Sequence, residues 1–394
     1  MIDVERVRAE TPGCRNVVHF NNAGAALPPQ RVVETVVAHL RREAEIGGYE
    51  AADEAEERLK AVYSSIARLL NAAPDEIALV ENATRAWDMA FYAVPLRAGD
   101  RILTASAEYA SNYIAFLQAA RRSGAEIAVV PNDASGQLSV EALDAMIDER
   151  VRLIAVTHVP TNGGLVNPAA EIGRIARRHG IPFLLDACQS VGQLPIDVAA
   201  IQCDMLSATG RKFLRGPRGT GFLWVRRDLI AGLEPPFLDL HAARWTTPDR
   251  YEIRADARRF ENWESFVAGR LGLGAAIDYA LALGLDAIAA RVGALAATLR
   301  DALAAIPGVA LHDLGRRRCG IVTFTVAGVP SEEVCRCLAA ARINAVTSSV
   351  FAARHDMTAR GLDMLVRASV HYYNTEAEIG RFCHVVQRCA AASR

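Results

Sequence analysis

The middle of the chain alternates short apolar runs with stretches in which apolar residues recur every three or four positions. The runs have the length and the flanking turn residues of strands, and the stretches between them have helical periodicity. We predict strands at 101–109, 126–133, 151–159, 182–188, 204–210 and 219–225. We predict helices at 111–122, 140–149 and 169–178. This alternation indicates βαβ units and a mainly parallel sheet.

The pattern changes after about residue 267. A helical stretch rich in Ala and Leu continues from there to about residue 304. Beyond it, strands at 320–326 and 366–373 alternate with helices at 331–341 and 375–392. The C-terminal third therefore predicts a second, smaller α/β unit.

Composition excludes several classes of function. Of the 394 residues 51% are apolar, the net charge is −1, and acidic and basic residues are interspersed. A nucleic-acid or membrane-surface partner requires a segregated basic patch, so we expect neither. No apolar run approaches the roughly 20 residues that span a bilayer, and the N-terminus lacks the apolar core of a secretion signal. We expect a cytoplasmic protein that acts on a small molecule.

The eight cysteines are scattered, and none forms a C-x-x-C pair. No His/Cys cluster has the spacing of metal ligands, so we expect free thiols and no metal site. Cys188 is expected to be a small, packed core residue.

Lys212 stands out because the chain almost always uses Arg for positive charge. Only Lys60 and Lys212 are lysines among the 44 Lys and Arg residues. An amine differs from a guanidinium in that it can lose a proton and attack a carbonyl carbon. Lys212 is therefore a candidate for covalent chemistry.

Polar residues around Lys212 follow the ends of predicted strands, where sites in open parallel sheets lie. They are Asp186, Gln189, Thr209 and Arg211. A pyridoxal phosphate site requires an amine that bonds to the cofactor aldehyde and a carboxylate that faces the pyridine nitrogen. Lys212 and Asp186 have the side chains for these two roles.

The segment ENATRAWDMAF (81–91) predicts a helix N-terminus at Ala83, Thr84 and Arg85. Free N–H groups and the helix dipole favour an anion there, and Thr84, Thr209 and Arg211 add donors for a phosphate. Each feature alone has an ordinary explanation as a helix cap or a turn. Together, and in this order along the chain, they favour a phosphate-bearing cofactor.

With these motifs the chain resembles the class V aminotransferase group of fold-type I pyridoxal phosphate enzymes, from FNNAGAALPP (20–29) to RASVHYYNTEAEI (367–379). The resemblance implies an α/β fold with a large, mainly parallel sheet of seven-stranded type. It implies an N-terminal segment at 1–20 that packs with the small domain and a cofactor-binding domain at 21–266. A long connecting helix and a small C-terminal domain would occupy 267–394. It also implies a homodimer with sites at the interface.

The resemblance also assigns roles to individual residues. Tyr109 would stack on the cofactor ring in place of a usual His, and Gln189 and Thr161 would lie near the ring oxygen O3′. Arg367 would bind the substrate carboxylate with its planar fork. Ser265 would reach the phosphate across a dimer interface, although Trp263 and Glu264 replace the usual Gly-Thr, and Arg211 stands where His is common.

The reaction is inferred from one missing residue and from a finer resemblance. Cysteine desulfurases carry sulfur on a cysteine in a loop before the carboxylate-binding Arg, and the segment 347–366 contains no Cys. The remaining motifs resemble the branch of cysteine S-conjugate and hercynylcysteine sulfoxide C–S lyases and isopenicillin N epimerase. That branch implies α,β-elimination in sulfur natural-product metabolism of the ergothioneine kind, with Lys212 as the base. The products would be pyruvate, ammonia and a thiol or sulfenate.

Other outcomes remain open. The same cofactor supports epimerisation, decarboxylation or transamination, and a non-catalytic cofactor-binding protein is a different class. A Rossmann oxidoreductase is disfavoured because no G-x-G-x-x-G follows the first strand. For the substrate side we propose Asn22, Tyr49 and Arg354; a surface corner at Tyr49 and a solvated loop at Arg354 are the alternatives.

Overall fold

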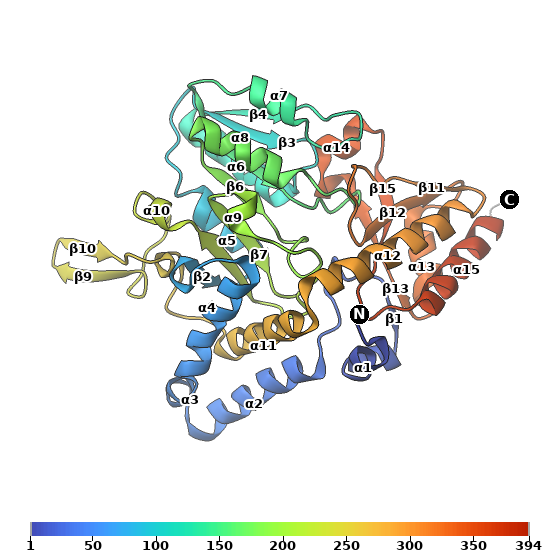
Figure 1. Cartoon of the computed structure of the whole chain (residues 1–394), viewed down its shortest axis with the longest axis horizontal. Coiled ribbons are helices and arrows are strands. Elements are labelled where there is room, and N and C mark those ends of the chain that lie inside the picture. Colours follow the sequence, from blue (N-terminus) through green and yellow to red (C-terminus); the bar gives the residue numbers. More distant parts are fainter. Residues whose placement is uncertain (1, 393–394) are drawn as a thin grey trace.

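A computed structural model describes residues 2–392. Its centre is a seven-stranded sheet with the order β2-β8-β7-β6-β5-β3-β4 (Figure 1). The strands are β2 (Ile77–Val80), β3 (Arg101–Ala105), β4 (Glu126–Val130), β5 (Val151–Thr157), β6 (Phe183–Asp186), β7 (Met205–Thr209) and β8 (Gly221–Val225). Neighbours from β7 to β4 are parallel, and β8 is antiparallel to both β7 and β2. The predicted α/β class with a mainly parallel sheet is confirmed.

The strands are apolar runs because both faces of the sheet are covered. Alternate residues of β5 enter different clusters, Leu153 and Ala155 on one face and Ile154 and Val156 on the other. Helices α5 (Ala83–Phe91) and α6 (Ala110–Ser123) pack on the first face. Helices α4 (Glu56–Leu70), α8 (Ala169–His179) and α11 (Val267–Leu283) pack on the second.

A smaller unit follows, built on an antiparallel sheet with the order β11-β12-β15-β14. Its strands are β11 (Val309–Leu311), β12 (Ile321–Val326), β14 (Val346–Ser349) and β15 (Met364–Ser369). Its helices are α12 (Leu285–Ala304), α13 (Ser331–Ala340) and α15 (Glu376–Ala392), seen to the right in Figure 1. The second α/β unit expected from the sequence is therefore present.

The expected single helix between the two units is wrong. It breaks at Gly284, whose φ of +86° suits glycine, and α11 and α12 are bent by 81° relative to each other. In the described residues no single helix is long and apolar enough to cross a membrane; α11 and α12 meet that length and composition only as a bent pair. Leu271 and Ile288, on the two sides of the break, are buried within the protein.

The N-terminal segment packs on the smaller unit. Strand β1 (Val18–His19) pairs in parallel with β13 (Ile343–Asn344), and α1 (Val4–Ala9) adds Val7 to the apolar cluster that also contains Phe20. The domain boundaries at 20/21 and 266/267 remain a prediction.

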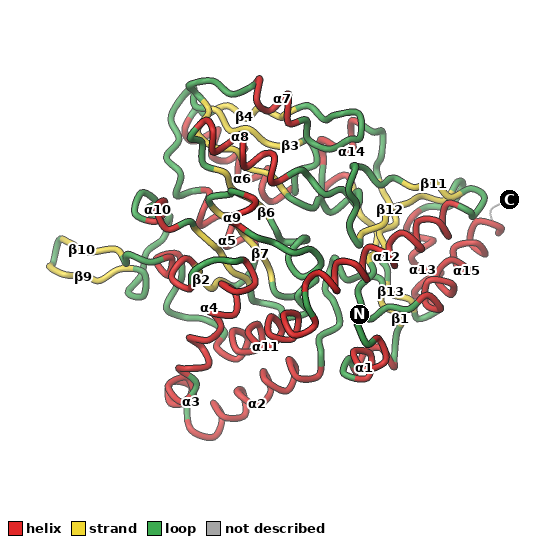
Figure 2. The backbone as a smooth tube through the Cα atoms, in the orientation of Figure 1, coloured by secondary structure: helices red, strands yellow, loops and turns green. Residues whose placement is uncertain are grey.

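The remaining elements lie outside the two main sheets. Helices α2 (Gln30–Ile46) and α3 (Gly48–Glu54) precede α4, and the hairpin of β9 (Ala243–Thr247) and β10 (Arg250–Ile253) projects from the body in Figure 2. The short helices are α7 (Val140–Ala145), α9 (Val198–Ile201), α10 (Arg227–Ile230), α14 (Arg354–Ala359), η1 (Pro12–Arg15), η2 (Pro74–Glu76), η3 (Ala257–Phe260) and η4 (Val350–Ala352).

Candidate active site

A cavity of about 460 Å³ opens where β5, β6 and β7 end. Thr157, Asp186 and Thr209 are the last residues of these three strands, and all three line it. Nine residues singled out in the sequence meet in its wall. They are Ala83, Thr84, Tyr109, Thr161, Asp186, Gln189, Thr209, Arg211 and Lys212. The topology of a parallel sheet brings them together because the carboxyl ends of its strands share one edge.

One end of the cavity is suited to an anion. Helix α5 begins there, with Asn82 as its N-cap accepting a hydrogen bond from the N–H of Arg85 at 2.9 Å. The first N–H groups of a helix lack partners inside it and carry its positive dipole end. The guanidinium of Arg211 lies 3.5 Å from Thr209 Oγ1. These donors match the oxygens of a phosphate group.

Asp186 is buried at the floor of the cavity. Asn112 Nδ2 donates to one of its oxygens at 2.9 Å and the Cys188 N–H to the other at 2.8 Å. Burial raises the pKa of Asp186, although these two donors and the nearby Lys212 charge act in the opposite direction. A carboxylate held in this way can face a protonated ring nitrogen.

Gln189 leaves a polar atom without a partner in the same wall. Its Nε2 donates to Ala23 O at 3.1 Å, whereas its Oε1 is buried with no hydrogen-bond partner among residues 2–392. Buried polar atoms rarely lack a hydrogen-bond partner in a folded protein that has its ligands bound. A cofactor that brings a hydroxyl to this wall would satisfy Gln189, so the residues present fit pyridoxal phosphate.

Arg367 lies on β15, behind Thr161, and its Nη1 donates to Thr161 Oγ1. No carboxylate of the described chain pairs with it, and its Nε is buried without a partner. Burial lowers the pKa of Arg367 to about 10, and the charge of Arg211 acts in the same direction. A buried cation without an acid can bind an incoming carboxylate.

Five other candidate residues lie outside the cavity wall. Arg85 turns away, with Nη2 2.9 Å from Asn262 Oδ1 and its guanidinium over the ring of Phe237. Ser265 lines a separate small cavity of about 20 Å³, which shares Glu81 and Gly219 with the main one.

Of the three proposed substrate contacts, Asn22 is fully buried and accepts a hydrogen bond from Tyr373. Its amide donates to Ser369 O at 2.7 Å, so it joins the N-terminal segment to the smaller unit and we do not carry it forward as a substrate contact. Tyr49, on α3, is 71% exposed, and the guanidinium of Arg354, on α14, lies over the ring of Phe351. Both stay predictions.

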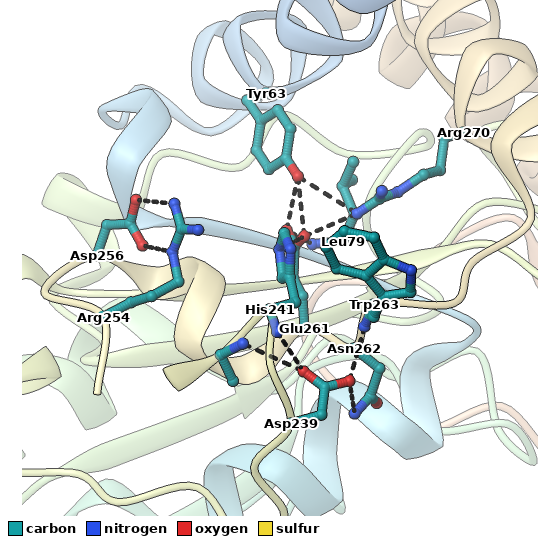
Figure 3. Close-up of polar contacts among 11 residues, drawn as sticks. Tyr63, Leu79, Asp239, His241, Arg254, Asp256, Glu261, Asn262, Trp263 and Arg270 are labelled. Carbon is teal, nitrogen blue, oxygen red and sulfur yellow. Dashed lines mark hydrogen bonds and ion pairs between the residues drawn. The ribbon is translucent and has the colours of Figure 1, made fainter. Parts of the chain in front are cut away.

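The segment that carries Ser265 is held by buried charge (Figure 3). Glu261 is fully buried and accepts hydrogen bonds from the Tyr63 hydroxyl at 2.8 Å, the Leu79 N–H at 2.7 Å and Arg270 at 2.7 Å. Burial alone would raise the pKa of Glu261, but His241, Arg270 and the other donors lower it on balance. The segment is thus fastened to the edge strand β2, beside the start of α5.

Sequence reasoning missed several residues of the wall. They are Glu81, Asn82, Asn112, Thr157, Val159, Cys188, Arg218 and Gly219. Asn112 could have been found, because in EYASN it lies four positions after the acidic Glu108, at the start of the predicted helix 111–122. Cys188 lines the cavity in contact with Lys212, so our expectation of a simple core residue is wrong.

Known proteins resemble the chain over nearly its whole length. The aminotransferase class-V family model matches residues 18–382. A probable cysteine desulfurase of Xylella fastidiosa (strain 9a5c) is 34% identical over 96% of this chain and 94% of its own. The apo structure of a cysteine desulfurase from Thermococcus onnurineus NA1 superposes with a TM-score of 0.91 at 26% identity, covering 100% of this chain and 99% of that one.

A cystine C–S lyase in complex with cysteine persulfide has a TM-score of 0.86 at 24% identity, covering 96% of this chain and 99% of that one, and shows the shared fold alone. The named relatives are cysteine desulfurases, so the expected membership of a C–S lyase branch is not shown. Pyridoxal phosphate, the cofactor expected from the sequence, agrees with the family and with the residues of the cavity. The chain belongs to the aminotransferase class-V family of fold-type I pyridoxal phosphate enzymes.

Proposed function

We propose that this enzyme cleaves the Cβ–S bond of a cysteine S-conjugate or sulfoxide by α,β-elimination. One water is consumed, and the products are pyruvate, ammonia and the thiol, or the sulfenate from a sulfoxide. The names of the relatives support action on a cysteine C–S bond. The choice of elimination rests on the thiols of this chain.

The observation that carries the proposal is the absence of a thiol from the segment 347–366. This segment comprises most of β14, η4 and α14, and it lies near the cavity because Asn162 Nδ2 donates to Ser349 O at 3.1 Å. Transfer of sulfur to the enzyme requires a thiolate as acceptor. Elimination requires none, since the sulfur leaves with its own substituent.

The residues of the cavity suit each step. The cofactor, when bound, supplies an electron sink for the bond that breaks at Cα. Arg367, with Thr161 beside it, would bind the substrate carboxylate, and Tyr109 would cover the ring. The Lys212 amine would take the proton from Cα, and Asp186 would hold the proton of the ring nitrogen. Thr84, Thr209 and Arg211 would anchor the phosphate.

Homodimerisation is part of the proposal. Phe237, Trp263 and Phe266 are between 42% and 52% exposed. They lie beside the small cavity or beside the contact between Arg85 and Asn262, and both of these features adjoin the main site. A second copy over this surface would bury them and could bring Ser265 to its partner's phosphate site. Measurement of the solution mass by light scattering tests this, and a monomer at working concentration would contradict it.

A second candidate function rests on Cys188. Of the cysteines in the described part of the chain it alone lines the main cavity, and burial raises its pKa. If Cys188 accepted sulfur, cysteine would give alanine and an enzyme persulfide. A raised pKa disfavours the thiolate that this step needs.

Product analysis separates the two functions. The purified holoenzyme is incubated with cysteine, cystine and an S-alkyl cysteine, and pyruvate, alanine and released thiol are measured. Elimination predicts pyruvate and thiol in equal amounts from the S-alkyl substrate. Alanine without pyruvate would favour sulfur transfer to Cys188, and inversion at Cα or loss of CO₂ would favour the other reactions of the family.

A further inference from the structure

A second buried carboxylate lies behind Asp186 and has no role in the steps above. Glu108, 3% exposed, precedes the N-cap of α6. Five donors reach its two oxygens: the hydroxyls of Thr104 and Thr157, the N–H groups of Tyr109 and Thr157, and the amide of Asn112. So many donors favour the ionised carboxylate over the neutral acid.

Asn112 joins this carboxylate to Asp186. Its Nδ2 lies 2.9 Å from Glu108 Oε1 and 2.9 Å from Asp186 Oδ2. A side-chain amide nitrogen carries two hydrogens, and here each points at one acid. Glu108 therefore fixes the orientation of the group that orients Asp186. It also accepts the N–H of Tyr109 at 2.9 Å, which fixes the start of α6 beside the cavity.

The charges around the pair are few. Lys212 acts on Asp186 and Cys188, and Arg211 on Cys188, whereas Asp186 is the charged neighbour that acts on Glu108. Burial raises the pKa of Glu108 to about 7, and the Asp186 charge adds to the rise against its hydrogen-bond donors. A negative Glu108 favours a proton on any base that is hydrogen-bonded to Asp186.

We propose that Glu108 is a positioning residue that acts through Asn112 on Asp186 and keeps the cofactor's ring nitrogen protonated. The cofactor becomes a weaker electron sink when Glu108 takes up a proton, so its ring responds to pH near neutrality. The inference rests on the cofactor site of the proposed function and not on the choice of substrate. The test therefore uses the holoenzyme without substrate.

The test is the nitrogen chemical shift of bound ¹⁵N-labelled pyridoxal phosphate between about pH 5.5 and about pH 9, a range that includes the pKa of Glu108. In the unaltered protein we expect a step near pH 7. In Glu108→Gln we expect no step and a proton affinity of the ring nitrogen about tenfold lower, as removal of one charge in a partly polar interior produces. A step and an affinity equal to those of the unaltered protein would overturn the proposal.

Two further variants make the test independent of whether Glu108→Gln folds. Thr157→Val removes one hydroxyl donor and little volume, so the step should move to higher pH; an unmoved step overturns the proposal. Asp204→Asn alters another buried carboxylate, which pairs with Arg226 before β7 begins. The Asp204→Asn protein should keep its chemical-shift step near pH 7. Loss of the step in this variant would overturn the proposal, because it would show that removal of any buried acid changes the titration of the ring.

Discussion

Arg367→Met should stabilise the protein and abolish recognition of the substrate. Arg367 is partly exposed, but its Nε is buried without a partner, its guanidinium makes one hydrogen bond to Thr161, and no acid of the described chain pairs with it. Methionine has a similar length and no charge to desolvate. Stability and activity should therefore move in opposite directions, a result that a simple packing role would not give.

The magnitude follows from the pKa. A fall from the ordinary 12.5 to about 10 corresponds to about 3 kcal/mol against the charged form in the folded state. Loss of the Thr161 hydrogen bond offsets about 1 kcal/mol of this. For a chain of this length the remaining gain raises the melting temperature by about 1 to 3 °C. Loss of two charge-assisted hydrogen bonds to a substrate carboxylate raises the free energy of the transition state by about 3 to 6 kcal/mol. The value of kcat/KM should therefore fall by at least about a hundredfold.

Arg215→Met is the matched control. Arg215 is more deeply buried than the partly exposed Arg367, and Leu27 O, the Tyr372 hydroxyl and Thr11 Oγ1 accept hydrogen bonds from Arg215 at 2.8, 2.6 and 2.5 Å. Burial alone would lower its pKa, yet the tyrosine oxygens beside it raise it on balance. Removal of this side chain leaves buried acceptors unpaired and should cost about 2 to 5 kcal/mol.

The assay combines calorimetry of the cofactor-bound variants with titration of the cofactor's visible absorption. Each variant is titrated with an S-alkyl cysteine and with the corresponding amine that lacks the carboxylate. Arg367→Met should lose the preference for the carboxylate and keep its affinity for the cofactor. If it melts as low as Arg215→Met, or still prefers the amino acid, the assignment of Arg367 to the substrate is refuted.

Three further predictions concern the active site and its support. Lys212→Ala should lower turnover by about 10²- to 10⁴-fold while circular dichroism stays unchanged, and activity close to that of the unaltered enzyme would contradict its role as the base. Cys188→Ala should keep pyruvate production within about threefold, an effect below 1 kcal/mol, whereas loss of all turnover would indicate sulfur transfer. Glu261→Gln should cost about 3 to 5 kcal/mol in denaturant melts because it leaves Arg270 unpaired. Since the pKa of Glu261 is lowered from 4.5, this cost should be full above that pH and shrink on acidification; a cost independent of pH would be inconsistent with an ionised Glu261.

The sheet and the place of the site could be predicted because they follow from local patterns. Runs such as FLL (183–185) are apolar throughout, which is typical of strands covered on both faces, and Asp186 is the first polar residue after this run. The direction of β8 follows from the length of the connection before it and not from its residue pattern. A strand buried on both faces has the same residue pattern whether it runs parallel or antiparallel, and the short connection 210–220 allows only the second.

Residues whose roles depend on distant partners were beyond the sequence. Asn22 resembled a residue at the mouth of the site, but its partners Ser369 and Tyr373 are about 350 positions away. The bond between Asn112 and Asp186 likewise spans 74 positions. Local spacing could have revealed only the half of the network between Glu108 and Asn112, since those two residues are four positions apart.

Two arginines show what distinguishes the active site from the framework around it. Desolvation acts against the charge of both Arg215 and Arg367, and only Arg215 recovers this cost through several partners of its own. Gln189 Oε1 is likewise left without a partner in the cavity wall. Unpaired groups that lie together around Lys212 destabilise the protein when no ligand is bound. This free-energy cost would be offset when a cofactor and a carboxylate supply the missing partners. On this proposal the same imbalance would make Arg367→Met stabilising and would favour ligand binding, and a ligand that satisfies both groups should raise the melting temperature of the unaltered enzyme more than that of the variant.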